Sequence, residues 1–529
     1  MADTTLDDRT RAELAALARE ADLPGRSSMN RAQLIEALRD RGNGGGADPN
    51  GDGAGALGDG PEPPEDAART TGERGGRSPV SRVAAFETLA RARAEGQMVL
   101  VPRQLHGNDR RMHVRETVRE DHRFRIDRNA EGTQEKFDVL ADSQYAFFRG
   151  TALLFYRDMA GEDARMPTVL ALGDVHPGNF GVMPSADNVP IFGVNDFDEA
   201  SYAPFTWDLK RGSTGFLLGA EVLGGRGPGK AEEVVRCFVR GYLDGMATFA
   251  RRGDETDTQV RRDNAPPLIA DLIAGAVARP RAGWLADKHL NPTRTGFKVS
   301  RKCVPVTSRV EEFQEIVDRY VAENGIDVPA RANGMQVKDV ARRLGKGTAS
   351  LGLTRYHVLL GGPAGDGTDD LVLEFKQARR SALAGLVPPS NFRLDGYGGR
   401  IRDAQRVQLV GGDVFFGAAS VDGQSFMVRE RAPYRDDLDL EDISGSEWRE
   451  YAGICGRVLA HTHSLSDDAG EVDYDVEPAV LEAAGEPELF VDDMLRFAGE
   501  AVDRLRADHA AFRADHALGA FQHLELVYD

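Results

Sequence analysis

Carboxylate and amide side chains gather in one stretch of this sequence. Leu172-Gly-Asp-Val-His-Pro-Gly-Asn-Phe180 is followed, after a short turn-rich interval, by Val194-Asn-Asp-Phe-Asp-Glu199. The two motifs supply four candidate metal ligands, which are Asp174, Asn179, Asp196 and Asp198. Carboxylate and amide oxygens are the hard ligands that Mg²⁺ prefers, usually together with phosphates of a substrate. The pattern therefore favours a magnesium-dependent phosphoryl site, although Asp, Asn, Gly and Pro also occur in ordinary turns for backbone reasons alone.

Two apolar runs must position these side chains. The runs Val169 to Leu172 and Val189 to Val194 each end close to a carboxylate, and turn-forming residues lie between them. The sequence predicts that the two runs are paired strands, which deliver the four ligands to one edge.

A second site with phosphate-binding character is predicted further along the chain. Arg343-Leu-Gly-Lys-Gly-Thr-Ala-Ser-Leu-Gly352 precedes the strand-like segment Thr354–Leu360, and a second strand is expected at Leu371-Val-Leu-Glu-Phe-Lys-Gln377. A Gly-rich turn between antiparallel strands lets backbone N–H groups approach phosphate oxygens closely. The segment is no Walker A motif, because Gly347 follows Lys346 where Ser or Thr is needed. Nor is it a dinucleotide-binding fingerprint, which needs a strand and then a helix.

The predicted strand at 371–377 carries a lysine, and this strengthens the weak signal of the glycines. A lysine that points inward from an apolar strand can reach the α- and β-phosphates of a nucleotide, as the strand lysine of protein kinases does. Lys376 is placed to do so. Downstream, the periodicity predicts helices at 397–410, 448–463 and 480–517, and strands at 414–418 and 425–430.

Composition excludes several classes of protein. The chain has 529 residues and a formal net charge of −19, which would repel nucleic-acid phosphates and anionic lipids over most of the surface. Its 3 cysteines are far apart and indicate neither a disulfide framework nor a zinc site. The first residues lack the order of a signal peptide, and no apolar run approaches the roughly 20 residues that span a bilayer. We expect a cytoplasmic protein without membrane contact.

The amino-terminal part of the sequence is predicted to be separate from the rest. Residues 8–41 read as a small two-helix module that resembles the Rho-terminator amino-terminal (SAP-like) module. The resemblance implies a nucleic-acid contact through its arginines, and a protein partner is an equal alternative. Residues 42–79 are rich in Gly, Asp, Pro and Glu and are expected to be a flexible linker.

The motifs of the remaining chain resemble those of known families. Gly173-Asp-Val-His-Pro-Gly-Asn179, Asp196-Phe-Asp198 and Trp207-Asp-Leu209 are similar to the catalytic loop, metal-binding motif and structural aspartate of aminoglycoside phosphotransferases and other kinase-like enzymes. The larger set, with Phe148-Arg-Gly150, the Gly-rich hairpin and Phe375-Lys376, closely resembles the bacterial domain-of-unknown-function family 2252 over about residues 85–510.

This resemblance implies an α+β, protein-kinase-like two-lobed fold with its elements in a changed order. In kinase-like folds the Gly-rich hairpin and its lysine precede the catalytic loop, whereas here they follow it. We infer a circular permutation, which is tolerated where the original termini can be bridged at the surface. The expected domains are a large catalytic lobe with a bridging segment at 80–335, a small nucleotide-binding lobe at 336–435, and helices that complete the large lobe at 436–529.

The resemblance also implies a role for each candidate residue. Asp174 would accept or orient the proton of an attacking hydroxyl, Asn179 and Asp196 would hold Mg²⁺ with Asp198 as a further ligand, and Asp208 would brace the catalytic loop. The catalytic set is Asp174, Asn179, Asp196 and Lys376. The expected nucleotide-binding set is Gly345, Lys346, Gly347, Thr348, Ser350, Gly352, Lys376, Asp403 and Glu430. Asp403 stands where relatives have the glutamate that pairs with the strand lysine.

The predicted function is that of an ATP- and Mg²⁺-dependent phosphotransferase that acts on a small-molecule or protein hydroxyl acceptor. A nucleotidyl transferase on the same fold is the chemical alternative, because a reversed ATP would present its α-phosphate. An adaptor that binds a nucleotide without catalysis, or associates with nucleic acid through residues 8–41, is the alternative from another class.

Overall fold

The computed structural model describes residues 82–97, 99–127, 132–344, 352–393 and 396–523, together with four positions near the amino terminus. These are Leu14, Leu17, Ile35 and Leu38 of the predicted 8–41 module, and all four are helical. Leu14 and Ile35 are buried, as the apolar faces of two packed helices would be. The rest of the module and the predicted linker at 42–79 lie outside the described residues, so the nucleic-acid or protein contact of the module stays a prediction.

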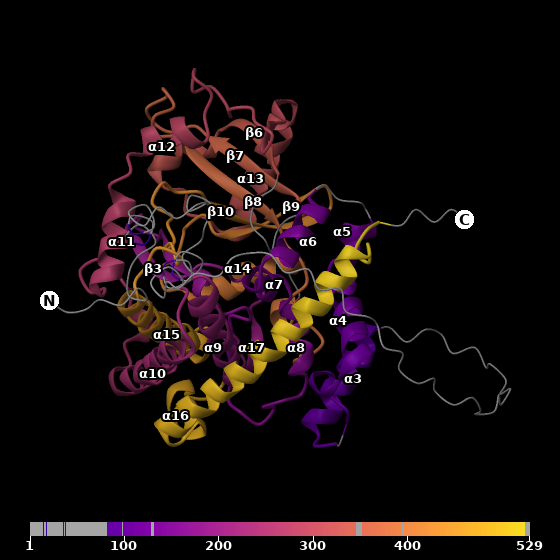
Figure 1. The fold of residues 1–529 in the computed structure, drawn as a ribbon. Coiled ribbons are helices and arrows are strands. Elements are labelled where there is room, and N and C mark those ends of the chain that lie inside the picture. Colours follow the sequence, from indigo (N-terminus) through magenta and orange to yellow (C-terminus); the bar gives the residue numbers. More distant parts are fainter. Residues whose placement is uncertain are drawn as a thin grey trace, which may run out of the picture.

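Six antiparallel strands form the main sheet, which lies at one end of the molecule while most of the helices lie at the other (Figure 1). The strand order is β5-β6-β7-β8-β10-β9. Their bounds are β5 Cys303–Pro305, β6 Val337–Arg343, β7 Arg355–Leu360, β8 Leu371–Gln377, β9 Gly417–Val421 and β10 Gln424–Glu430. The strands predicted at 354–360 and 371–377 are confirmed as β7 and β8, which are antiparallel neighbours.

The sheet has one apolar face and one charged face, and the charged face also carries a smaller apolar cluster that includes Leu359 and Val372. On the apolar face, Phe375 of β8 contacts Phe313 and Tyr320 of helix α13 (Val310–Asn324), with ring centroids 5.9 and 6.1 Å apart. Because successive residues of a strand point to opposite faces, Glu374 and Lys376 project from the other side. Helix α13 and β5 come from the segment that the sequence assigned to the large lobe, yet both belong to the sheet and its core.

The strand pairing around the two acidic motifs differs from the prediction. β1 (Thr168–Ala171) pairs with β4 (Ser201–Pro204), and β2 (Phe180–Pro184) pairs with β3 (Pro190–Val194). The runs at 169–172 and 189–194 are therefore not partners. The prediction was wrong because residues 180–184 are themselves a buried strand, and the short turn that follows them closes a local hairpin with β3.

Three long helices form the centre of the helical part. They are α9 (Phe205–Val222), α10 (Pro228–Arg252) and α15 (Gly445–Asp468). Helices α10 and α15 approach closely because glycines lie at the contact: a Cβ on Gly456 would stand 2.1 Å from the carbonyl oxygen of Phe238. The buried apolar residues of these helices and those of β1 to β4 form one hydrophobic core. The strands next to the acidic motifs are therefore packed on this core.

The remaining helices surround this core, and α17 runs across it from α16 to the region of α4, α5 and α6 (Figure 1). The predicted helix at 480–517 is two helices, because Gly485 adopts a positive φ of 64° and Pro487 starts a new helix. The bounds are α3 Arg82–Ala94, α4 Gly107–Asp121, α5 Arg123–Asp127, α6 Thr133–Asp142, α7 Gln144–Gly150, α8 Ala152–Asp158, α11 Pro267–Val277, α12 Arg281–Lys288, α14 Gly396–Gln408, α16 Val476–Ala484 and α17 Pro487–Ala517. Short 3-10 helices are η3 Pro102–Gln104, η4 Pro177–Asn179, η5 Glu255–Asp257, η6 Thr307–Arg309, η7 Ala330–Met335 and η8 Asn391–Arg393.

The mixture of antiparallel sheets and many helices confirms the predicted α+β class. In the part of the chain that the structure describes, no helix is both long and apolar enough to cross a bilayer.

Candidate active site

The lysine of the sheet meets the carboxylates of the second acidic motif. Lys376 Nζ lies 2.5 Å from Asp198 Oδ2 and 4.0 Å from Asp196 Oδ2. The lysine comes from β8 of the sheet, and both aspartates come from the loop between β3 and β4 of the helical part. The structure thus brings together the two stretches that the sequence analysis identified separately.

Asp196 and Asp198 form an unequal pair. Burial disfavours ionisation of both, but the charge of Lys376 and its hydrogen bond outweigh burial at Asp198 and lower the pKa of this carboxyl. At Asp196, desolvation and then repulsion by Asp198 raise the pKa above its usual value. Asp198 Oδ1 is buried and has no hydrogen-bond partner among the described residues. The pair therefore combines excess negative charge with an unsatisfied oxygen.

The loop between β1 and β2 is fixed by Asp208, a fully buried residue in the first turn of α9. The Asp208 carboxylate accepts hydrogen bonds from the backbone N–H groups of Leu172 at 2.5 Å and Gly173 at 3.0 Å. His463 of α15 lies 3.0 Å from the same carboxylate through Nε2, and its Nδ1 lies 2.9 Å from the Tyr242 hydroxyl. Asp208 therefore makes the contacts expected of a residue that braces the loop.

Asp174 lies at the start of this loop and is held from one side. The guanidinium of Arg211 donates from Nε at 3.0 Å and from Nη2 at 2.7 Å to a single oxygen, Asp174 Oδ1. Arg211 also stacks on the ring of Phe148, with its central carbon 3.6 Å from the ring centroid. The nearest ionisable group to the other oxygen is His176, whose Nε2 lies 3.9 Å from Asp174 Oδ2. Burial and the charges of Arg149 and Arg211 keep the pKa of His176 well below its usual value, so its imidazole is neutral.

Asn179 connects the two acidic motifs. Its side-chain Nδ2 donates to the backbone carbonyl of Asp174 at 2.7 Å, and its own carbonyl accepts from the N–H of Asn195 at 3.0 Å. Because Asn195 directly precedes Asp196, this chain of contacts fixes the spacing between Asp174 and Asp196. The amide oxygen of Asn179 is not used in the contact with Asp174 and can serve as a ligand.

A glycine sets the closest approach of the two motifs. Gly173 has a φ of 83°, which L-residues with a side chain rarely adopt, and a Cβ at this position would lie 2.4 Å from the carbonyl oxygen of Glu199. The backbone next to Asp174 is thus in direct contact with the end of the Asp196–Glu199 motif.

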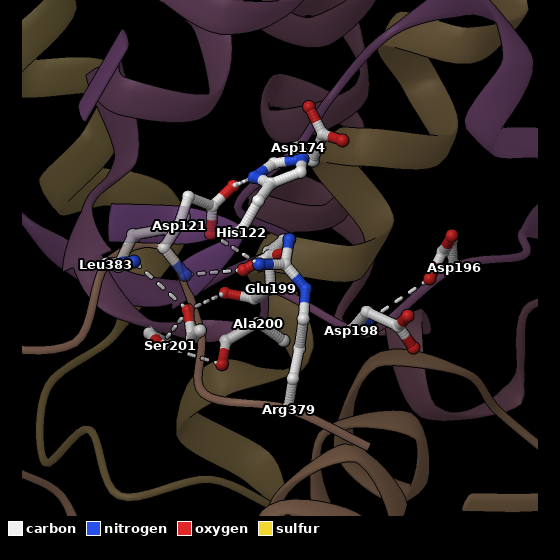
Figure 2. A network of polar contacts seen from close by, with 12 residues as sticks. Asp121, His122, Asp174, Asp196, Asp198, Glu199, Ala200, Ser201, Arg379 and Leu383 are labelled. Carbon is white, nitrogen blue, oxygen red and sulfur yellow. Dashed lines mark hydrogen bonds and ion pairs between the residues drawn. The ribbon is translucent and has the colours of Figure 1, made fainter. Parts of the chain in front are cut away.

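A network of ion pairs and hydrogen bonds next to Asp198 holds the chain that follows β8 in place. Figure 2 shows the guanidinium of Arg379 between two carboxylates, Asp121 of α4 and Glu199, and both ion pairs measure 2.7 Å. The Glu199 carboxylate also accepts from the N–H of Ala382 at 2.5 Å. Arg400 of α14 donates to the backbone carbonyls of Asp198 at 2.5 Å and Ala200 at 2.8 Å. These contacts fix the position of Asp198 relative to Lys376.

The charged face of the sheet continues away from Lys376. Glu374, two residues earlier on β8, accepts from Arg355 of β7 at 2.9 Å and from Arg429 of β10 at 2.8 Å. Burial opposes its charge, but the surrounding arginines outweigh burial and hold the pKa of Glu374 well below its usual range. Arg429 reaches further, to the backbone carbonyl of Asn195 at 3.3 Å. The sheet therefore contacts the Asp196 motif through two cations, Lys376 and Arg429.

Several residues of the predicted nucleotide-binding set lie apart from this cluster. Asp403 of α14 pairs with its neighbour Arg402 at 2.7 Å, and Lys376 contacts Asp196 and Asp198 instead. The carboxylate of Glu430 is buried between Arg281 at 3.0 Å and Arg331 at 2.7 Å, so its side chain serves the structure at the end of β10. Gly345, Lys346, Gly347, Thr348 and Ser350 lie outside the described residues. Gly352 is described and has a positive φ of 79°, as expected in a turn.

Sequence reasoning missed the arginines that position the site. Arg211 follows Asp208 by three residues, so both lie on one face of α9, and this spacing is the signal that could have identified it. Arg379, Arg400 and Arg429 carry no comparable signal, because each is brought to the site by the tertiary fold alone.

The residues present fit a divalent cation. Asp196, Asp198 and Asn179 offer hard oxygen ligands, and the buried unpaired Oδ1 of Asp198 is the kind of atom that a bound cation satisfies. After desolvation, repulsion by Asp198 raises the pKa of Asp196, and a bound cation would neutralise this repulsion.

Fold and site together define an α+β protein in which a sheet lysine faces a pair of aspartates, beside a braced loop with a third aspartate. The chain belongs to the family described as an uncharacterized protein conserved in bacteria (DUF2252), whose match covers residues 128–515. This confirms the family resemblance noted in the sequence. No curated protein and no solved structure matches the chain.

Proposed function

We propose that this protein is an ATP- and Mg²⁺-dependent phosphotransferase with a circularly permuted kinase-like fold. The observation that carries the proposal is the contact of Lys376 with Asp198 and Asp196, beside a loop that presents Asp174 and Asn179. These five side chains come from two stretches that are far apart in the sequence. Phosphoryl transfer relies mainly on positioning and charge neutralisation, and it needs this combination of a lysine, metal-binding carboxylates and a third carboxylate near the acceptor.

In this proposal Asn179, Asp196 and Asp198 hold Mg²⁺, which neutralises charge on the phosphate groups when it is bound. Mg²⁺ held by Asp196 and Asp198 would compensate the charge of Asp198, which Lys376 neutralises in this structure. Lys376 then becomes available to the α- and β-phosphates of ATP. Arg429 stays in place because Glu374 holds its guanidinium.

Asp174 orients the hydroxyl group of the acceptor and takes up its proton. A new bond forms between the hydroxyl oxygen and the γ-phosphorus, the bond from that phosphorus to the β-γ bridging oxygen breaks, and ADP leaves. Arg211 binds only Oδ1, so Oδ2 is the oxygen that faces the acceptor.

The changed order of elements is part of the proposal. Read cyclically from 337, the chain gives the Gly-rich hairpin, Lys376, helix α14, the strands β9 and β10, helix α15, and then the loop with Asp174 and the motif with Asp196. This is the usual kinase-like order, with the cut placed in the large lobe. A permuted kinase-like fold requires Lys376 to lie close to Asp196, as it does here. Two independent domains would not require this contact.

Binding of a fluorescent ATP analogue to the full chain, with and without MgCl₂, tests the proposal. We expect Mg²⁺-dependent binding to wild type and roughly 100-fold weaker binding to Lys376→Ala and Asp196→Ala, because each loses a charge that contacts phosphate or metal. Lys288→Ala, at an exposed lysine of α12, is the matched control and should bind as wild type does. Wild type without Mg²⁺-dependent binding would contradict the proposal.

Turnover separates the two transfer reactions. Slow hydrolysis of ATP in the absence of an acceptor should release ADP and phosphate. Release of AMP and pyrophosphate would instead identify a nucleotidyl transferase at the same residues.

A further inference from the structure

A second group of carboxylates lies where helix α15 ends and α16 begins, at the opposite end of the molecule from the main sheet (Figure 1). Asp467 is in the last turn of α15, Asp475 is the N-cap of α16, and Glu477 is in the first turn of α16. One oxygen from each of these three lies within 4.8 Å of the others. The two helices that meet here thus place three carboxyl groups around one point.

Glu477 is the unusual member of this group. Its side chain is only 5% exposed, and its Oε1 is buried without a hydrogen-bond partner among the described residues. Buried carboxylate oxygens are ordinarily hydrogen-bonded or paired with a cation. Glu477 is instead directed at two other carboxylates.

The surrounding charges have the same sign. Asp468 and Glu255 of η5 also face the group, and the neighbouring charges that act most strongly on Glu255, Asp467 and Glu477 are all carboxylates. The negative charge of these grouped carboxylates must be balanced by a proton or by a bound cation.

Two features favour the cation. Asp475 makes no side-chain capping hydrogen bond to α16, so its carboxylate is not engaged by the helix that it precedes. The carboxyl end of α15 adds the partial negative charge of a helix terminus.

We propose that Asp467, Asp475 and Glu477 bind a hard divalent cation, with Ca²⁺ preferred over Mg²⁺. Calcium takes six to eight oxygen ligands, including several carboxylates, whereas Mg²⁺ is usually held by one or two carboxylates and keeps its waters. The exposed Asp475 leaves room for water to complete the coordination. The site is separate from the Asp196 site, and it joins the end of α15 to the start of α16.

Calcium binding to the full chain, measured by titration calorimetry after removal of metals, tests this site. The Asp196→Asn variant serves as the parent, because it weakens the other candidate metal site. We expect the parent to bind Ca²⁺, and Glu477→Gln in this background to bind it at least roughly tenfold more weakly. Glu482→Gln, at an exposed glutamate of the same helix, is the matched control and should keep the parent affinity. Titration with MgCl₂ should give weaker binding than CaCl₂.

Two results would overturn the proposal. One is a parent that binds no Ca²⁺ at millimolar concentration, which would leave protons to balance the charge. The other is a Glu477→Gln variant with the parent affinity. If Glu477→Gln does not fold, Asp475→Asn decides by the same criterion, because Asp475 is exposed and its side chain does not cap α16.

Discussion

Two groups of carboxylates in this chain lie in opposite electrostatic surroundings. Asp198 and Glu374 each contact a cation of the sheet, at 2.5 and 2.9 Å, and these cations lower the pKa of both carboxyls in spite of burial. The carboxylates at the junction of α15 and α16 face one another. A negative charge therefore stabilises the first region through its partners and opposes folding in the second.

The difference shows what decides the effect of a buried carboxylate. Removal of one partner of a buried ion pair leaves the other charge uncompensated, whereas removal of one member of a like-charged group relieves repulsion. Substitutions that neutralise a carboxylate should thus have opposite signs in the two regions, and this can be measured.

The largest effect is expected for Glu374→Gln. This change leaves Arg355 and Arg429 without their carboxylate on the charged face of the sheet. We expect the free energy of unfolding to fall by about 3–5 kcal/mol, as for other broken buried ion pairs. Urea unfolding monitored by circular dichroism measures it, with the exposed Glu311→Gln of α13 as control. A fall in the free energy of unfolding no larger than that of the control would contradict the proposed electrostatic difference between the two regions.

The pH dependence of stability tests the same face of the sheet. Burial lowers the pKa of His357, beside Glu374, from 6.5 to about 4, so the folded protein binds fewer protons than the unfolded chain between these values. This contribution to stability is complete above pH 6.5 and is lost as the pH falls towards 4. It amounts to about 2 kcal/mol between pH 7 and pH 5. Between pH 7 and pH 5, the free energy of unfolding of His357→Gln should therefore fall by about 2 kcal/mol less than that of wild type. The exposed His106→Gln should show the same fall as wild type.

The opposite sign is expected for Glu477→Gln in the presence of EDTA. Neutralisation removes repulsion by Asp467 and Asp475, and we expect the free energy of unfolding to rise by about 1 kcal/mol at pH 8. Thermal unfolding measures the change. If the variant is less stable than wild type under these conditions, the negative charge at the junction of α15 and α16 is already balanced by other groups. In CaCl₂ the order should reverse, because only wild type gains from the bound cation.

The smallest effect is expected for Asp403→Asn. Asp403 pairs with the adjacent Arg402 near the surface of α14, and such pairs contribute less than about 1 kcal/mol. Nucleotide affinity should change by less than about threefold, in contrast to Lys376→Ala. A loss as large as that of Lys376→Ala would instead make Asp403 a partner of the lysine in the nucleotide-bound protein.

Much of the site could be predicted because its residues follow local rules. The alternation of β8 identified Lys376 as an inward-facing lysine, and the motif around Asp174 gave both the residues and their spacing. The α+β class was implied by the resemblance of these motifs to known families. These signals lie within single strands, turns or helices, where the spacing of residue types determines which side chains share a face.

What could not be predicted depends on contacts between distant segments. The pairing of β1 with β4 involves residues 30 or more positions apart, and nothing in either strand specifies its partner. Arg379 and Arg400 bind the Asp198–Glu199 backbone and side chains only because α14 and the chain after β8 fold over it. The acidic group at 467–477 had no signal either, because acidic residues are common on helix surfaces and its effect comes from burial.

The contact of Gly173 with the Glu199 carbonyl limits how this protein can diverge. The positive φ disfavours residues with a side chain at this position, and a Cβ there would overlap the Glu199 carbonyl oxygen at 2.4 Å. A compensating change elsewhere could supply space but could not remove the conformational strain. Position 173 should therefore stay glycine while the rest of the chain diverges.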